Sequence, residues 1–403
     1  MDDIAPVSWP APAPDPGAVG TYLGDCSLPV LRQRTSFKWR RYPDDVLPAF
    51  VAEMDYDLAP PIKAAVTAAI ASSDVGYAHI GRLGAVFAAF AAERLGWSPD
   101  PARIFTIPDV MTGIAEMILA LTPPGSAIVI SPPVYAPFFF RIGFTGRTIV
   151  EAPLARRADG GYDLDPEALD RVLSQDNVSA YLLCSPHNPV GRVWSADDLR
   201  MVADLCHAHG KLVLADEIHA PLVLPGAVQV PFLSLDHPAT ARAIAFTSAS
   251  KGWNTPGLKC GVAVAGSDAM AEHLADRWEA LLAGHLGVIA TVAAFEQSLP
   301  WLDAVLAQLG QNRGLMSQLL AEQLPAIRYT QPEASFLAWL DCRELGFGDD
   351  PAATFLDRGK VALTSGPDFG APGNGFARLN MGTSPELLRE AVRRMAVAVA
   401  GPA

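Results

Sequence analysis

The sequence predicts an α/β protein, with a three-layer large domain on a mainly parallel sheet and a smaller α+β domain at the C-terminal end. Helix-like segments alternate with short apolar segments through the first two thirds of the chain, which is typical of a three-layer domain. From about residue 284 the pattern changes to long helical stretches followed by strand-like segments. The chain has 403 residues, of which 50% are hydrophobic and 18% charged. This is enough for two to three domains at about 150 residues each.

The large, three-layer domain is expected at residues 35–284, after a flexible, Pro-rich arm at residues 1–34. Residues 35–58 are expected to pack with the small domain. A first helix is predicted at residues 60–73, because its two leading prolines suit a first turn and its apolar residues recur at helical spacing. The expected strands are short, continuously apolar and therefore buried on both faces; they are residues 127–130, 181–184, 211–216, 243–248 and 260–266.

Residues 195–210 predict a helix with defined ends between two of these strands. Ser195 can cap it, Asp198 fits the acid of a capping box, and Gly210 provides a left-handed exit. The small domain is expected at residues 285–403. It is predicted to hold helices over 285–323, strand-like segments at 328–331, 335–341, 360–363 and 376–380, and a last helix over 384–400.

Charge and cysteine content exclude several classes of function. Acidic residues outnumber basic ones by 43 to 30, giving a net charge of −13, which disfavours binding to nucleic acid or to an anionic membrane surface. No apolar run approaches the roughly 18 residues of a membrane span, and the acidic N-terminus does not resemble a signal peptide. The five cysteines are scattered without a C-x-x-C pair, so we expect reduced thiols, no metal site and a cytoplasmic protein.

Polar residues follow three of the expected strands at the edge where open α/β sheets bind ligands. They occur in residues 185–191 (SPHNPVG), 216–219 (DEIH) and 248–252 (SASKG). Taken singly, Asn188 is an ordinary turn residue, Asp216 a solvated acid and Lys251 a surface lysine. Together they describe a pocket with an amide, a carboxylate, hydroxyls and an amine.

This set of groups matches the needs of pyridoxal 5′-phosphate. The cofactor requires a lysine for its covalent bond, a carboxylate for its ring nitrogen, a donor to its phenolate oxygen, an aromatic face and donors to its phosphate. In this order, the three segments resemble the signature of fold-type I pyridoxal-phosphate enzymes, the aspartate aminotransferase superfamily. A large pyridoxal-phosphate-binding domain and a homodimer follow from that resemblance.

Further segments resemble the MalY/PatB group of cystathionine β-lyases, also called C–S lyases. They are residues 35–57 (TSFKWRRYPDDVLPAFVAEMDYD), 76–81 (GYAHIG), 131–138 (SPPVYAPF), 248–261 (SASKGWNTPGLKCG) and 376–384 (FARLNMGTS). The similarity covers roughly residues 35–400.

The resemblance assigns roles to individual residues. Lys251 matches the lysine that bonds to the cofactor and moves the α-proton, and Asp216 matches the carboxylate partner of the ring nitrogen. Asn188 and His219 match residues around the phenolate oxygen. Tyr135 matches the aromatic ring that stacks on the cofactor, although the spacing alone does not exclude a core tyrosine.

The remaining assignments concern the phosphate and the substrate. Ser248, Ser250 and Lys259 suit the phosphate, as do the N–H groups of Val110 and Met111 at a helix start. Tyr77 matches a tyrosine that reaches the phosphate in the neighbouring subunit, which implies a dimer with shared sites. Arg378 matches the residue that binds the substrate α-carboxylate.

Three positions depart from the pattern of the family. Asp109 stands where relatives often have Ser or Gly, and because an anion there repels phosphate, either its side chain points away or the match slips by one residue. Val190 replaces the commoner Thr of the turn, and residues 332–339 (PEASFLAW) differ from the usual run.

The sequence therefore predicts a pyridoxal-phosphate-dependent β-lyase acting on cystathionine or a cysteine S-conjugate. An aminotransferase is the alternative, because it uses every residue named so far. Residues 248–251 also satisfy the S-x-x-K pattern of serine acyltransferases, but the S-D-N and K-T-G partners of that class do not occur. A transcription regulator on this fold would need a basic DNA-binding domain, which the acidic residues 1–34 do not provide.

Overall fold

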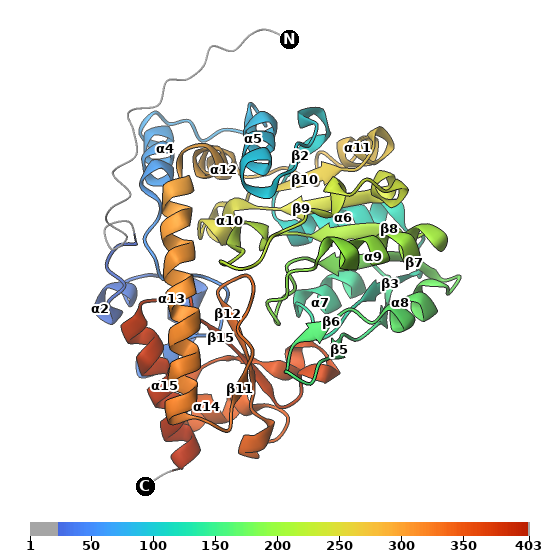
Figure 1. Cartoon of the computed structure of the whole chain (residues 1–403). Helices are drawn as coiled ribbons and strands as arrows, with labels where there is room; N and C mark the ends of the chain where they lie inside the picture. Colours follow the sequence, from blue (N-terminus) through green and yellow to red (C-terminus); the bar gives the residue numbers. More distant parts are fainter. Residues whose placement is uncertain (1–22, 402–403) are drawn as a thin grey trace.

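The computed structural model describes residues 23–401 and contains the predicted three-layer domain (Figure 1). Its central sheet has the strand order β2-β10-β9-β8-β7-β3-β4. The strands are β2 (Ile104–Ile107), β10 (Gly261–Ala265), β9 (Ala243–Thr247), β8 (Leu212–Asp216), β7 (Val178–Cys184), β3 (Ala127–Ile130) and β4 (Thr148–Glu151). All pairings are parallel except the two made by β10. The sheet is therefore mainly parallel, as expected.

Alternate residues of the central strands enter two separate cores. In β8, Leu212 and Leu214 pack on one face, and Val213 and Ala215 on the other. Helices α6 (Val110–Leu121), α7 (Pro137–Phe144) and α11 (Asp268–Ala275) cover the first face, and α8 (Pro166–Leu173) and α9 (Ala196–Ala208) the second. The continuous apolar runs in the sequence result from this burial on both faces.

Helices α4 (Pro60–Ala71), α5 (Leu83–Leu95) and α12 (His285–Gln297) pack together beside β10. The small domain is expected to begin at residue 285, but α12, its first expected helix, lies with the large domain (Figure 1). The sequence pattern did not separate α12 from the next helix, because Ser298 alone divides two long helical runs.

The small domain follows the 25-residue helix α13 (Leu299–Gln323). Its antiparallel sheet has the order β11-β12-β15-β14, with β11 (Arg328–Tyr329), β12 (Leu337–Asp341), β15 (Phe376–Asn380) and β14 (Thr364–Ser365). Helices α14 (Pro351–Gly359) and α15 (Pro385–Ala400) pack on it. Short elements complete the fold: α2 (Leu28–Leu31), α3 (Phe37–Arg40), β1 (Leu47–Pro48), β5 (Ala155–Arg156), β6 (Tyr162–Asp163), α10 (Ala249–Gly252) and β13 (Val361–Ala362).

The segment before α4 contacts the small domain, since strand β1 pairs in parallel with β13. The arm expected at residues 1–34 differs from the structure over its last part, because Cys26 and Leu31 are buried in the core. Residues 1–22 lie outside the described residues. No helix between residues 23 and 401 is long and apolar enough to cross a membrane.

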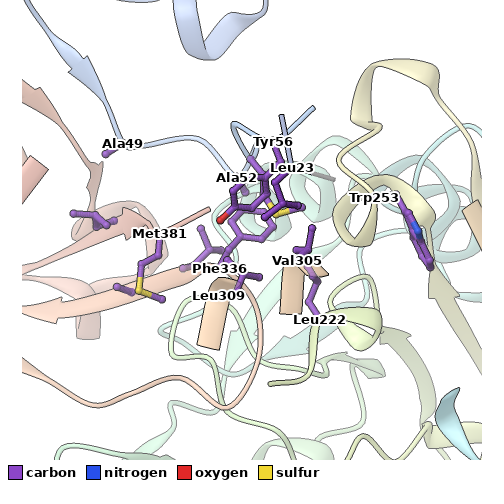
Figure 2. Close-up of a cluster of buried hydrophobic side chains, with 14 of the residues drawn as sticks. Leu23, Ala49, Ala52, Tyr56, Leu222, Trp253, Val305, Leu309, Phe336 and Met381 are labelled. Atoms are coloured by element: carbon purple, nitrogen blue, oxygen red, sulfur yellow. The ribbon is translucent and has the colours of Figure 1, made fainter. Parts of the chain in front are cut away.

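The two domains share one hydrophobic core. Figure 2 shows Val305 and Leu309 of α13 among side chains from several parts of the chain, including Tyr56, Phe336 and Trp253. All five are at most 3% exposed. Burial of this apolar surface stabilises the contact between the domains.

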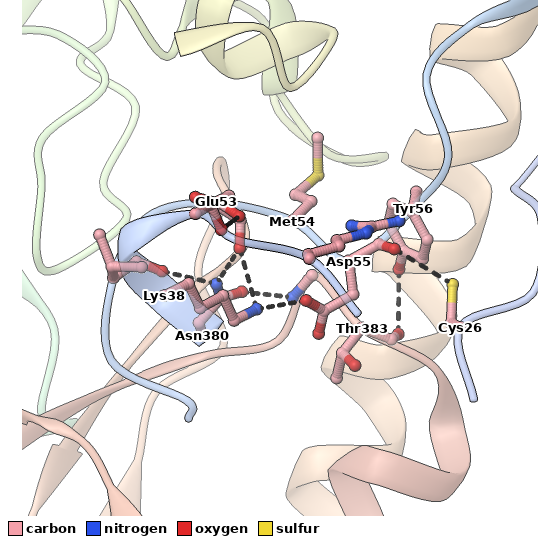
Figure 3. Close-up of polar contacts among 12 residues, drawn as sticks. Cys26, Lys38, Glu53, Met54, Asp55, Tyr56, Asn380 and Thr383 are labelled. Carbon is pink, nitrogen blue, oxygen red and sulfur yellow. Dashed lines mark hydrogen bonds and ion pairs between the residues drawn. The ribbon is translucent and has the colours of Figure 1, made fainter. Parts of the chain in front are cut away.

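Residues 49–56, called the strap below, contribute to this core and are hydrogen-bonded to both domains. Figure 3 shows part of the strap, from Glu53 to Tyr56. Within it, Asp55 forms an ion pair of 2.7 Å with Lys38, and both side chains are at most 3% exposed. Lys38 Nζ also donates to the Glu53 carbonyl at 3.0 Å. From the small domain, Asn380 Nδ2 donates at 2.7 Å to the carbonyls of Val51 and Glu53.

Replacing Lys38 with Met should lower the free energy of unfolding by about 3–5 kcal/mol, because the Asp55 carboxylate is then buried without a partner. Urea unfolding followed by circular dichroism measures the change. The control is Arg34→Met, which breaks a 3.2 Å pair with Asp57 whose side chains are 27% and 57% exposed; its cost should stay below about 1 kcal/mol. Equal stability of the two variants would contradict a structural role for the buried pair.

Candidate active site

The structure places most of the predicted site residues around one cavity of about 280 Å³. It lies at the carboxyl ends of β7, β8 and β9, beside the N-terminus of α6. The predicted residues that line it are Val110, Met111, Tyr135, Asn188, Asp216, His219, Ser248, Ser250, Lys251 and Lys259. Open α/β sheets bind their ligands at this edge.

A larger cavity of about 710 Å³ lies between the hairpin of β5 and β6 and the small-domain sheet. Its charges are already matched within the protein: Arg156 pairs with Asp341 at 2.6 Å, Arg157 with Asp159 at 3.1 Å and Arg192 with Glu333 at 2.8 Å. The smaller cavity holds charges without such partners. We therefore assign the candidate active site to the smaller cavity.

Asp216 is a buried carboxylate at the end of β8. It is 3% exposed, and its Oδ1 accepts a hydrogen bond of 3.1 Å from the Ile218 N–H. Burial raises the pKa of this carboxyl to about 7, against smaller opposing effects of the Ile218 hydrogen bond and of Lys251. Between residues 23 and 401 it forms no ion pair with a cation. A protonated ring nitrogen would supply the missing positive charge.

Lys251 lies in α10, just after β9, and its Nζ donates to the Ala52 carbonyl of the strap at 2.7 Å. Burial, followed by the positive charge of Arg378, lowers the pKa of its amine to about 8. A lysine with such a pKa loses its proton readily near neutral pH. It is therefore suited to act as a nucleophile and as a base.

Three further side chains would surround an aromatic ring held between Asp216 and Lys251. Burial and the Asp216 charge raise the pKa of Tyr135 to about 12, so its phenol is neutral. Burial lowers the pKa of His219 to about 3, so its imidazole is neutral, and its Nδ1 has no hydrogen-bond partner in the described part of the chain. The Oδ1 atom of Asn188 accepts from Arg378 at 3.1 Å, which leaves its NH₂ group as a donor.

Arg378 is a buried guanidinium of β15, 5% exposed. It donates to neutral acceptors: to Asn188 Oδ1 at 3.1 Å, and to the Phe50 carbonyl and Thr364 Oγ1 at 3.2 Å each. Its Nε has no partner, and no carboxylate between residues 23 and 401 pairs with it. Because an unpaired buried cation is costly, this position fits a ligand carboxylate.

The expected phosphate end is formed by the start of α6 and by the segment after β9. Val110 and Met111 are the first residues of α6, where N–H groups point out of a helix. Ser250 lines the cavity, but the Ser248 hydroxyl donates to the Cys260 carbonyl at 2.7 Å and accepts from Ser250 N. Ser248 is thus occupied in holding this segment.

Asp109 does not point away from the cavity, contrary to one of the two expectations for it. It lines the cavity, caps α6 through Thr112 N at 2.8 Å, and pairs with Lys259 Nζ at 3.1 Å. Tyr77 lies outside the cavity, in the link between α4 and α5, with 94% of its surface exposed. The structure therefore brings Lys259 to the site together with an unexpected acid, and leaves Tyr77 apart.

Sequence reasoning missed the backbone of the strap and the residue that fixes it. Asn254 holds Met54 by two hydrogen bonds of 2.8 Å, one to its carbonyl and one from its N–H. Both segments belong to motifs that carry the family resemblance. Their roles were missed because a main-chain carbonyl such as that of Ala52 leaves no mark in the residue type.

The groups around the cavity fit pyridoxal phosphate. Among the described residues, the buried Asp216 forms no ion pair and the His219 Nδ1 atom has no hydrogen-bond partner, and the pKa of the Lys251 amine is lowered to about 8. Donors remain at the start of α6 and at Ser250 for a phosphate. When bound there, the cofactor would be held by Lys251, Asp216, Tyr135 and these donors.

Comparisons with known proteins show which family the chain is similar to. The family model for class I and II aminotransferases matches residues 53–395. A Mycobacterium leprae protein named "Putative cystathionine beta-lyase" is 43% identical over 395 residues, covering 93% of this chain and 97% of the relative. Cystathionine beta-lyase PatB of Bacillus subtilis is 33% identical, covering 88% and 93%. A crystal structure described as "a putative plp-dependent beta-cystathionase" from Corynebacterium diphtheriae has a TM-score of 0.88 and 34% identity, covering 94% of this chain and 100% of that one.

The pKa of Lys251 should respond in opposite directions to two substitutions. Arg378→Met removes a positive charge and should raise it, whereas Asp216→Asn removes a negative charge and should lower it further. The measurement is the pH dependence of amine acylation at Lys251 in cofactor-free protein, read by mass spectrometry. In the unsubstituted protein the midpoint should lie near 8. Shifts of the same sign in both variants would contradict the electrostatic account.

Proposed function

Because the chain belongs to the class I and II aminotransferase family, we propose that it is a pyridoxal-phosphate-dependent carbon–sulfur β-lyase. The proposed substrates are cystathionine and related cysteine S-conjugates. One observation carries the proposal: Asp216, Lys251 and Arg378 converge on one cavity and its rim, and none of the three forms an ion pair between residues 23 and 401. The names of the relatives support elimination as the reaction.

Arg378 and Lys251 divide the binding of an amino acid between them. The guanidinium would take the α-carboxylate, since its present partners at Asn188, Phe50 and Thr364 are neutral oxygens. This contact would place Cα beside Lys251. The Lys251 amine would then remove the α-proton, which its pKa of about 8 allows near neutral pH.

Bound pyridoxal phosphate supplies an aromatic ring that accepts the electrons left on Cα. Asp216 would keep a proton on the ring nitrogen, because its negative charge stabilises the protonated form. His219, neutral in this environment, and Asn188 would donate to the phenolate oxygen. Tyr135 would stack on the ring and exclude water from that face.

In the proposed reaction, a cysteine conjugate and one water give a thiol, pyruvate and ammonium. The carbon–sulfur bond at Cβ would break, the sulfur would leave as the thiolate and take up a proton to give the thiol, and Lys251 would again be free to hold the cofactor. An aminotransferase remains the second candidate, because proton transfer by Lys251 serves that reaction equally. The relatives named cystathionine beta-lyase favour elimination.

Purified protein incubated with cystathionine should release pyruvate and homocysteine in equal amounts when no 2-oxo acid has been added as an amino-group acceptor. Lys251→Ala should lose more than about 1,000-fold in kcat, since it removes both the covalent attachment and the base. Coupled pyruvate and thiol assays measure both products. Turnover that depends on an added 2-oxo acid, with formation of a new amino acid, would instead establish the aminotransferase.

We also propose a homodimer in which Tyr77 completes the site of the partner. Tyr77 is 94% exposed, and the neighbouring Ile70 and Val75 are 57% and 60% exposed. Apolar groups exposed together commonly mark an interaction surface. A cytoplasmic location is proposed as well, supported by five cysteines that are all free and buried.

Mixing Tyr77→Ala with Lys251→Ala protein should restore activity when subunits exchange. Each variant alone should be weakly active or inactive, but mixed dimers would contain one site with both residues intact. Activity after mixing, against the unmixed variants, is the measurement. No recovery despite demonstrated exchange, or a monomer by light scattering, would refute the shared site.

A further inference from the structure

An anionic side chain stands where the proposed function places the cofactor phosphate. Asp109 lines the cavity as the cap of α6, with Oδ1 bonded to Thr112 N at 2.8 Å and Oδ2 to Lys259 Nζ at 3.1 Å. Burial alone would raise the pKa of this carboxyl, but the hydrogen bonds from Thr112 and Lys259 outweigh it and lower the pKa. Asp109 is therefore negatively charged at neutral pH.

The donors left for a phosphate are few. The N–H groups of Val110 and Met111 donate to no acceptor among the described residues, and the Ser250 hydroxyl is likewise unused. Lys259 is already paired with Asp109, and its side chain is 61% exposed. Arg141 also lines the cavity, from the exposed face of α7. The cap on α6 further offsets the positive end of that helix.

We propose that Asp109 weakens the hold of this site on the phosphate of its cofactor. It repels the phosphate and competes with it for Lys259. This inference rests on the proposed function, which places pyridoxal phosphate here. The cofactor is then retained mainly by its bond to Lys251 and by the contacts of its ring.

A weak phosphate contact affects elimination and transamination differently. Elimination returns the cofactor to Lys251 in every cycle, so a weak phosphate contact is tolerated. Transamination leaves the cofactor as an amine without a bond to Lys251, and that form depends on the phosphate contacts. Asp109 thereby promotes loss of the cofactor after transamination and favours elimination as the lasting activity.

Pyridoxamine 5′-phosphate tests the proposal, because it cannot bond to Lys251. In Asp109→Asn, which retains a capping oxygen and removes the charge, its dissociation constant for cofactor-free protein should fall about tenfold or more. Pyridoxamine, which has no phosphate, should bind both proteins within about twofold of one another. Fluorescence titration measures both constants.

The matched control is Asp165→Asn, at the cap of α8, where the carboxylate accepts from Ala168 N at 3.0 Å and lies outside the cavity. It should leave both constants unchanged. Unchanged or weaker binding of pyridoxamine 5′-phosphate to Asp109→Asn would overturn the inference and leave the proposed function standing. If the unsubstituted protein forms no borohydride-reducible bond with pyridoxal phosphate, the proposed function itself fails.

Discussion

The hydrogen bonds to the backbone of the strap, residues 49–56, are the interaction on which the site depends. The Ala52 carbonyl accepts from Lys251 of the large domain, and the Phe50 carbonyl accepts from Arg378 of the small domain. Lys251 and Arg378, the two groups proposed to act on the same substrate, are thus both hydrogen-bonded to one short segment. The buried pair of Lys38 and Asp55 fixes that segment (Figure 3), so the spacing between base and carboxylate site follows from the fold of the strap.

The hydrogen-bond acceptors of Lys251 and Arg378 carry no charge, which leaves the positive charges of these side chains available to a ligand. A carbonyl stabilises an ammonium or guanidinium group through its dipole but leaves the net charge in place, whereas a carboxylate would cancel it. Lys251 and Arg378 are both held by oxygens of this neutral kind. Asp216 is held in the same manner by the N–H of Ile218. The protein thus positions each of these three charges and, between residues 23 and 401, neutralises none of them with an ion pair.

The sequence predicted the strand ends and the polar side chains that follow them, because burial on both faces leaves a continuous apolar run before each. It did not predict that β10 runs antiparallel, since strand direction leaves no trace in local hydrophobicity. The separation of α12 from the small domain and the burial of Leu31 depend on packing against distant segments. The roles of the strap carbonyls were not predicted either, because the main chain is the same at every residue.

The expected phosphate end of the cavity differs from the surroundings of Asp216 and Arg378 in how its charges are paired. Asp216 and Arg378 are buried charges that form no ion pair among the described residues. At the start of α6, by contrast, Asp109 and Lys259 already form an ion pair with each other. These two residues are 150 positions apart in the sequence, so neither local pattern revealed the pair. An unmatched charge favours a bound ion, whereas a matched pair must be disturbed to receive one. In the proposed function, binding energy is therefore expected to concentrate at Asp216, beside the ring nitrogen, and at Arg378, beside the substrate carboxylate, where the proposed chemistry needs its groups held in place.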